Sequence, residues 1–139
     1  MIVRPSKPGR VRRGTHTVEF AVTLPVLLVF LWGIVDLGRG FMISSILTHA
    51  ARAGCRAGVV PNATTGDVRG AVTAALNATS VSGTTTTVLV NGAHKSVTTA
   101  RPQDQVTVTV SVPVSKVSWL PGAGYVKGTL TGQFTLPHE

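Results

Sequence analysis

The sequence predicts an α+β protein: a long N-terminal transmembrane helix that continues into an extracytoplasmic helix, a short second helix, and a small antiparallel sheet of three or four strands. Three observations support this prediction. Residues 20–35 form an apolar run without a charged side chain. No strong helix breaker then follows until Pro61. Residues 81–139 contain 11 Thr and 11 Val, two residue types that favour strands.

The composition of the 139 residues excludes several classes of protein. Hydrophobic residues make up 43% and charged residues 13%, whereas a disordered chain has low hydrophobicity and dense charge. Because Cys55 is the single cysteine, a disulfide framework and a cysteine-based zinc site are excluded. The five carboxylates and four histidines are scattered along the sequence. We therefore expect no catalytic residue, no metal, no cofactor and no small-molecule substrate.

The net charge of +8 is concentrated near the N-terminus. The first 14 residues hold five Lys or Arg and no acidic residue. A nucleic-acid-binding protein would carry a basic face interleaved with aromatic residues, so we expect no nucleic-acid partner. A basic flank before an apolar helix predicts instead a cytoplasmic N-terminus and an extracytoplasmic C-terminal domain, with the chain crossing the inner or plasma membrane once.

The apolar run is short for a membrane span. Its 16 residues make about 24 Å of helix, whereas the hydrocarbon core of a bilayer is about 30 Å thick. The span must therefore borrow neighbouring residues, which places Glu19 and Asp36 near the two interfaces. Pro25 removes one backbone donor inside this helix and marks a point where it can bend.

Glu19 stands where the apolar run begins, and an ionised carboxylate beside hydrocarbon needs a partner. Cleavage after Gly14 would create the α-amino group of Thr15 four residues, or one helical turn, before Glu19. That ammonium could neutralise Glu19, or Glu19 could accept the amine of a neighbouring subunit and set the axial register between packed helices. The remaining interpretation is a carboxylate that extends into the lipid headgroups.

The order of these motifs resembles the N-terminal region of the TadE-like family, pilin-like proteins associated with tight-adherence (Flp-type) pili. The elements that carry the resemblance are RG at 13–14, VEFA at 18–21, LP at 24–25, GIVDLGR at 33–39 and LTHAARAGCR at 47–56. The resemblance implies cleavage by a prepilin peptidase between Gly14 and Thr15, and a role as a minor pilin or pseudopilin. It implies as partners the peptidase, other pilin-like subunits, and an inner-membrane assembly platform with its secretion ATPase.

Two features mark the helix beyond the membrane. Asp36 and Arg39, three residues apart, are expected to pair just outside the bilayer and to mark the membrane exit. Ala50, Gly54 and Gly58 recur at every fourth position and form a ridge of small residues that lets another backbone approach closely. We expect this ridge to help the helix pack beside other pilin-like helices.

The C-terminal half is predicted to form a small domain that begins with a short amphipathic helix near Thr64. Strands are expected at residues 87–90, 95–100, 105–112 and 128–134, and a loop at 119–125. Asn91 and Gly92 form the turn between the first two strands. Because valine alternates strictly with polar residues over 105–112, one face of the sheet should be buried and the other polar.

These observations divide the chain into a basic cytoplasmic leader at residues 1–14, which processing removes, a transmembrane and extended helix at 15–60, and an extracytoplasmic α+β domain at 61–139. The leading interpretation is a single-pass, pilin-like membrane protein that works by assembly in the lipid bilayer. The alternative is a secreted or membrane-anchored binding or adhesion module behind an ordinary signal peptide or signal anchor, although no Ala-x-Ala cleavage site follows the apolar run.

Overall fold

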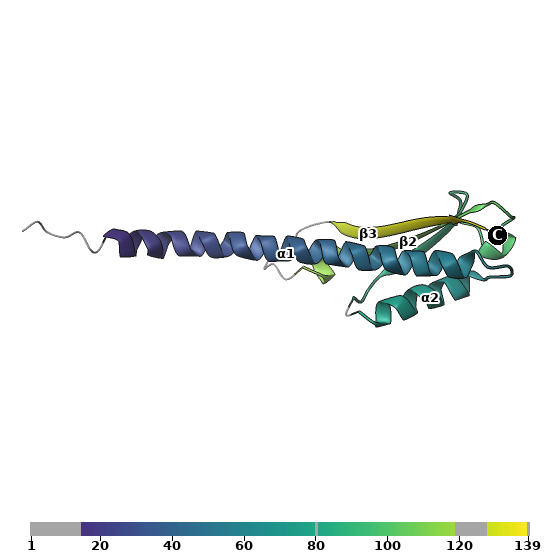
Figure 1. Cartoon of the computed structure of the whole chain (residues 1–139), viewed down its shortest axis with the longest axis horizontal. Helices are drawn as coiled ribbons and strands as arrows, with labels where there is room; N and C mark the ends of the chain where they lie inside the picture. Colours follow the sequence, from purple (N-terminus) through teal and green to yellow (C-terminus); the bar gives the residue numbers. More distant parts are fainter. Residues whose placement is uncertain (1–14, 80, 119–127, 139) are drawn as a thin grey trace, which may run out of the picture. The chain divides into compact units, whose positions relative to one another are not determined.

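The computed structural model describes residues 15–79, 81–118 and 128–138, with the side chain of Thr15 excepted. In these residues the chain forms the predicted α+β order of elements (Figure 1). The helices are α1 (Thr15–Gly58) and α2 (Thr65–Asn77), and the strands are β1 (Thr85–Val90), β2 (Gln105–Pro113) and β3 (Thr129–Pro137). Two short 3₁₀ helices, η1 (Val97–Thr99) and η2 (Val114–Lys116), flank β2. The chain divides into two compact units, Met1–Ile34 and Val35–Glu139.

The first unit holds the apolar N-terminal part of α1. By its length and composition α1 is able to cross a membrane, and none of its most apolar 18-residue window is buried in the protein. Helical structure continues through Pro25. Two residues before Pro25, the Thr23 hydroxyl donates a 2.8 Å hydrogen bond to the carbonyl oxygen of Glu19, one turn back along the helix. This unit therefore presents apolar side chains outward, as a membrane helix does.

The second unit is built on a three-stranded antiparallel sheet in the order β1-β2-β3. Val108 in the central strand pairs with Val88 on one side and Phe134 on the other. Because successive side chains of a strand point to opposite faces, the alternating valines of β2 all lie on one face. The members of this set, each fully buried, are Val106, Val108, Val110 and Val112. The opposite face is polar, and on it the hydroxyls of Thr107 and Thr135 lie 2.9 Å apart in a hydrogen bond.

The C-terminal part of α1 and the whole of α2 cover the buried face of the sheet. Leu47 and Ala51 of α1, and Val68 and Val72 of α2, are at most 1% exposed and belong to the same core cluster as the β2 valines. α2 begins where the sequence predicts. Thr64 caps it, and Asp67 accepts a 2.9 Å hydrogen bond from the Thr64 amide, which completes a capping box.

The predicted strand at residues 95–100 is wrong. The Asn91–Gly92 turn is present, with φ of 51° and 75°, the left-handed values of a tight hairpin turn. However, only Val90 and Ala93 form a bridge across it, and the chain then enters η1, which buries Val97. Residues 95–100 offer a single buried valine where β2 offers four, so the pairing edge of β1 goes to β2. The predicted loop at 119–125 and the basic leader at 1–14 lie outside the described residues.

Candidate functional site

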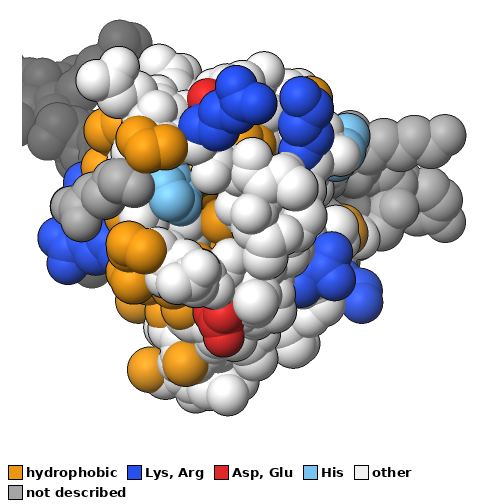
Figure 2. All heavy atoms as spheres, turned by 90° about the vertical axis from the view of Figure 1, so that its right-hand side faces the viewer, with side chains coloured by type: hydrophobic (Ala, Val, Ile, Leu, Met, Phe, Trp, Pro, Cys, Tyr) orange, Lys and Arg blue, Asp and Glu red, His pale blue; other side chains and the backbone are white. Residues whose placement is uncertain are grey.

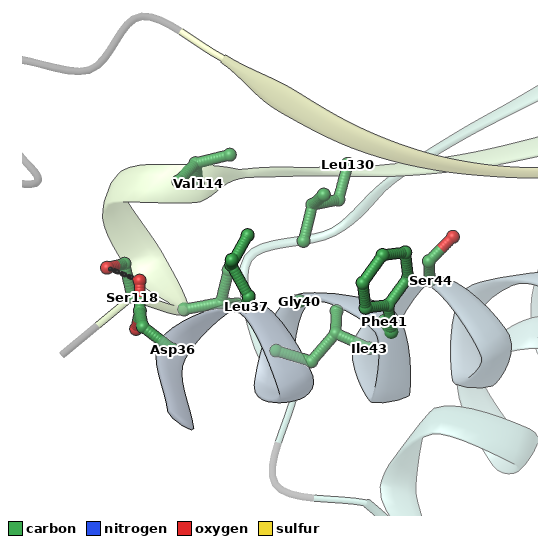
Figure 3. Close-up of a pocket in the computed structure, with 10 residues that line it drawn as sticks. Asp36, Leu37, Gly40, Phe41, Ile43, Ser44, Val114, Ser118 and Leu130 are labelled. Atoms are coloured by element: carbon green, nitrogen blue, oxygen red, sulfur yellow. Dashed lines mark hydrogen bonds between the residues drawn. The ribbon is translucent and has the colours of Figure 1, made fainter. Parts of the chain in front are cut away.

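The first candidate site lies where α1 enters the second unit. Asp36 accepts a 2.8 Å hydrogen bond from the Ser118 hydroxyl, drawn as a dashed line in Figure 3. Three residues further along α1, the Arg39 Nε donates a 2.7 Å hydrogen bond to the carbonyl oxygen of Val117. Both side chains on α1 are partly buried. Residues 117–118, about 80 positions away in sequence, thus form hydrogen bonds with both Asp36 and Arg39, the two residues predicted to mark the membrane exit. The expected ion pair between Asp36 and Arg39 stays a prediction.

An apolar pocket of about 320 Å³ lies next to the hydrogen bond between Asp36 and Ser118. Figure 3 shows α1 on one side of it, with β3 and the 3₁₀ helix η2 on the other. The residues that line it are Asp36, Leu37, Gly40, Phe41, Ile43, Ser44, Val114, Val117, Ser118 and Leu130. The surface of α1 at and next to the pocket is apolar and exposed: Phe41 is 76% exposed, and Leu37 and Met42 are each 66% exposed. Apolar surface therefore continues past the predicted membrane exit.

The ridge of small residues packs inside the second unit. A Cβ atom at Gly54 would lie 2.6 Å from Val72 Cγ2, and one at Gly58 would lie 2.9 Å from Val68 Cγ2, both on α2. Ala50 is 2% exposed. The element that packs closely against these small residues is thus α2 of the same chain, and valines of β2 lie next to it. The ridge is consequently not left open for the helix of another subunit.

Cys55 and Arg52, which lie in the C-terminal part of α1, both contact Phe134 of β3. The Cys55 thiol is fully buried and donates a 3.1 Å hydrogen bond to the carbonyl oxygen of Phe134. The guanidinium carbon of Arg52 lies 4.6 Å from the centre of the Phe134 ring, which is a cation–π distance. Cys55 is therefore a small buried side chain of the core.

The residues expected to direct processing and assembly lie at the start of α1. Thr15 is the first residue of the helix, and Gly14 lies outside the described part of the chain. Glu19 has a 73% exposed side chain, with its Oε2 atom 3.8 Å from Nδ1 of His16. Pro25 lies within the helix. Glu19 and Pro25, the residues expected to act in assembly, are thus on exposed helix surface in the first unit.

A polar cluster joins the turn after β1 to the loop before β2. Asp104 accepts hydrogen bonds of 2.8 Å from the Arg101 amide and from the Asn91 side chain, and these bonds lower the pKa of its carboxyl. Asn91 in turn accepts a 2.8 Å hydrogen bond from the Gln105 amide. Sequence reasoning missed this cluster, because it depends on residues that the turn brings together. The Asp104 carboxylate accepts hydrogen bonds from Arg101 and Asn91 of the same chain. The cluster therefore holds the turn and the loop before β2 together.

The end of the molecule that faces the viewer in Figure 2 carries dispersed charge. Lys and Arg side chains are separated from one another by polar and apolar surface. Among the residues that the structure describes, no group of three His, Cys, Asp or Glu side chains could hold a metal ion.

Comparison with known proteins matches residues 14–56 to the family model described as TadE-like protein. No curated protein and no solved structure matches the chain. The matched residues start at the glycine of the expected processing site and end in the part of α1 that packs on the sheet, so α2 and the strands lie outside the match. Residues 14–56 are thus similar to the TadE-like family, and α1, which among the described residues is the helix long and apolar enough to cross a membrane, fits a pilin-like protein.

Proposed function

We propose that this protein is a minor pilin or pseudopilin, a single-pass membrane protein that takes part in the assembly of a tight-adherence (Flp-type) pilus after a prepilin peptidase has removed residues 1–14. The observation that carries the proposal is the TadE-like match over residues 14–56, which coincides with an exposed apolar helix beginning at Thr15. Its partners in this role are the peptidase, other pilin-like subunits and the assembly platform in the inner membrane.

The proposed topology follows from charge and hydropathy. The basic leader at residues 1–14 stays in the cytoplasm, residues 15–60 form the transmembrane and extended helix, and residues 61–139 lie outside the cytoplasm. The C-terminal part of the extended helix belongs to the core of the outer domain, because Leu47, Ala51 and Cys55 are fully buried there. The part that remains for lateral contact with other subunits is therefore the exposed N-terminal part.

In this proposal Glu19 is the residue that orders neighbouring helices. Its carboxylate is exposed at the start of the apolar helix, where an unpaired charge is costly. The α-amino group that cleavage creates on Thr15 has a reference pKa of about 8, so it is mostly cationic at neutral pH. Pairing of this amine with Glu19 of the same chain removes the cost. Pairing with Glu19 of a neighbouring chain removes it as well and also holds the two subunits in axial register.

Processing is tested by N-terminal sequencing of the protein purified from membranes, with and without an active prepilin peptidase. We expect a chain that starts at Thr15 in the first case and one that retains Met1 in the second. An intact Met1 in cells with active peptidase, or a start beyond Gly38, would contradict the proposal. Extraction of membranes with alkaline carbonate addresses the alternative of a secreted module: the anchored protein stays in the membrane, and a secreted module is released.

Assembly is tested with Glu19→Gln, which removes the charge and keeps the shape of the side chain. We expect normal processing but loss of copurification with other pilin-like subunits. Thr17→Ala is the matched control, an exposed residue two positions earlier in the same helix, and it should leave copurification unchanged. Equal copurification of both variants would exclude the role of Glu19.

A further inference from the structure

We propose that the base of the second unit, formed by Leu37, Phe41, Met42 and the apolar pocket beside them, is embedded in the membrane interface and contacts phospholipid acyl chains. The proposal rests on the single-pass anchoring proposed above, and it does not depend on a role in a pilus. It moves the point at which α1 leaves the hydrocarbon from Asp36 to about Met42.

The first argument is the apolar surface itself. Leu37 and Phe41 are one helical turn apart and therefore lie on the same face of α1, and Met42 lies next to Phe41. All three side chains are at least 66% exposed although they belong to the folded unit. They follow directly on the exposed apolar side chains of the same helix, from Val18 to Val35. In the sequence of α1, these exposed apolar residues of the second unit thus follow directly those proposed to contact lipid.

The second argument concerns charge. Asp36 and Arg39 would ordinarily stop a helix from entering the hydrocarbon, because a charged group without partners is costly there. Here Ser118 donates to Asp36 and Arg39 donates to the Val117 carbonyl, so each charged side chain has a hydrogen-bond partner within the domain. From Gly40 to Ala51 the sequence contains no Asp, Glu, Lys or Arg. The next such residue is Arg52, which is exposed.

The third argument is length. The uncharged run at residues 20–35 makes only about 24 Å of helix against a hydrocarbon core of about 30 Å. Residues 20–42 are all helical, and at 1.5 Å per residue they make about 34 Å, enough to cross the core. Extension of the span to Met42 therefore removes the mismatch.

The fourth argument is the apolar pocket, which adjoins the exposed apolar surface at Leu37 and Phe41. Its volume is about 320 Å³, with walls of Leu37, Phe41, Ile43 and Leu130, and with Asp36 and Ser118 at one end (Figure 3). Phe41 belongs both to the pocket wall and to the exposed surface. An acyl chain that lies along Phe41 can thus enter between α1 and β3, while the polar groups at the end of the pocket remain bonded to each other.

The experiment places the photoreactive residue p-benzoylphenylalanine at position 41 or 42 of the full chain and irradiates it in its native membrane. Position 29 is the positive control, because Val29 is 72% exposed within the apolar run, and position 52 is the negative control on the same helix. Mass spectrometry of the purified protein identifies the adducts. We expect phospholipid adducts at positions 29, 41 and 42, and no phospholipid adduct at position 52.

Adducts at 41 and 42 that contain protein instead of lipid would show that another subunit covers this surface, and would overturn the proposal. A lipid adduct at 29 without one at 41 or 42 would overturn it as well. Because N-terminal sequencing and carbonate extraction test processing and anchoring independently, failure here is distinguishable from failure of the proposed function.

Discussion

Gly132 of β3 lies directly against the backbone of α1 at Thr48. A Cβ atom built on Gly132 would overlap the Thr48 amide nitrogen and the Leu47 carbonyl carbon, and would come within 2.7 Å of Leu47 Cβ. Helix and sheet thus meet here with no side chain between them. Gly132 pairs with Val110 in the middle of the ladder between β2 and β3, so this contact sets the distance between α1 and the whole edge of the sheet.

We predict that Gly132→Ala destabilises the second unit by about 1–3 kcal/mol, the usual cost of overpacking a core, because backbone atoms of α1 cannot turn aside as a side chain can. Thermal unfolding of the full chain in detergent, followed by circular dichroism, measures the change. Gly70→Ala is the matched control, because a Cβ there meets nothing within 4 Å, and it should stabilise α2 by about 1 kcal/mol or less. An unchanged unfolding temperature for Gly132→Ala would contradict the close approach.

The contact between Gly54 and Val72 gives a second prediction. Gly54→Ala should destabilise the unit less than Gly132→Ala, because the atom it meets is the side-chain carbon Cγ2 of Val72, and the higher helix propensity of alanine offsets part of the loss by about 1 kcal/mol. Val72→Ala should also destabilise the unit, because it leaves a cavity. In the double variant the new methyl group fills part of that cavity. We expect a favourable coupling of about 0.5–3 kcal/mol in a double-mutant cycle, and strict additivity would contradict the packing of α1 on α2.

The third prediction concerns pH. Hydrogen bonds from the Arg101 amide and the Asn91 side chain hold the pKa of Asp104 below its ordinary value of 3.8. A carboxyl whose pKa is lower in the folded chain than in the unfolded chain contributes stability above its unfolded pKa, and this contribution is lost as the pH falls through the folded pKa. The unfolding temperature should therefore decrease below about pH 4, and Asp104→Asn should reduce this decrease.

Asp67, the second carboxylate whose pKa hydrogen bonds lower, gives an independent test of the same pH effect. The side chain and the amide of Thr64 lower the pKa of Asp67 in the cap of α2, so Asp67→Asn should reduce the same acid-induced loss independently. If neither variant changes the difference in unfolding temperature between pH 7 and pH 3, these hydrogen bonds do not contribute to the stability of the domain.

Several elements follow from local patterns in the sequence. Uncharged apolar residues at 20–35 predict the N-terminal helix, Thr64 with Asp67 predicts the start of α2, and strict alternation at 105–112 predicts β2 with its buried face. The strand predicted at 95–100 is wrong because β-propensity and a hairpin turn do not state which later segment pairs with β1. That competition is decided by the number of side chains each segment can bury, and β2 buries four valines.

Local sequence patterns are enough to predict an apolar N-terminal helix with TadE-like motifs, followed by a small domain with one apolar and one polar sheet face. These features depend on residues within one or two turns of each other, and short-range periodicity encodes them. Three features emerge only from the folded chain. Asp36 and Arg39 bind residues 117–118, the small residues of α1 pack against α2, and apolar surface continues to Met42. Each of these depends on which groups meet across about 10 to 80 residues of chain. Burial and hydrogen bonding reward proximity in space, which local patterns do not specify.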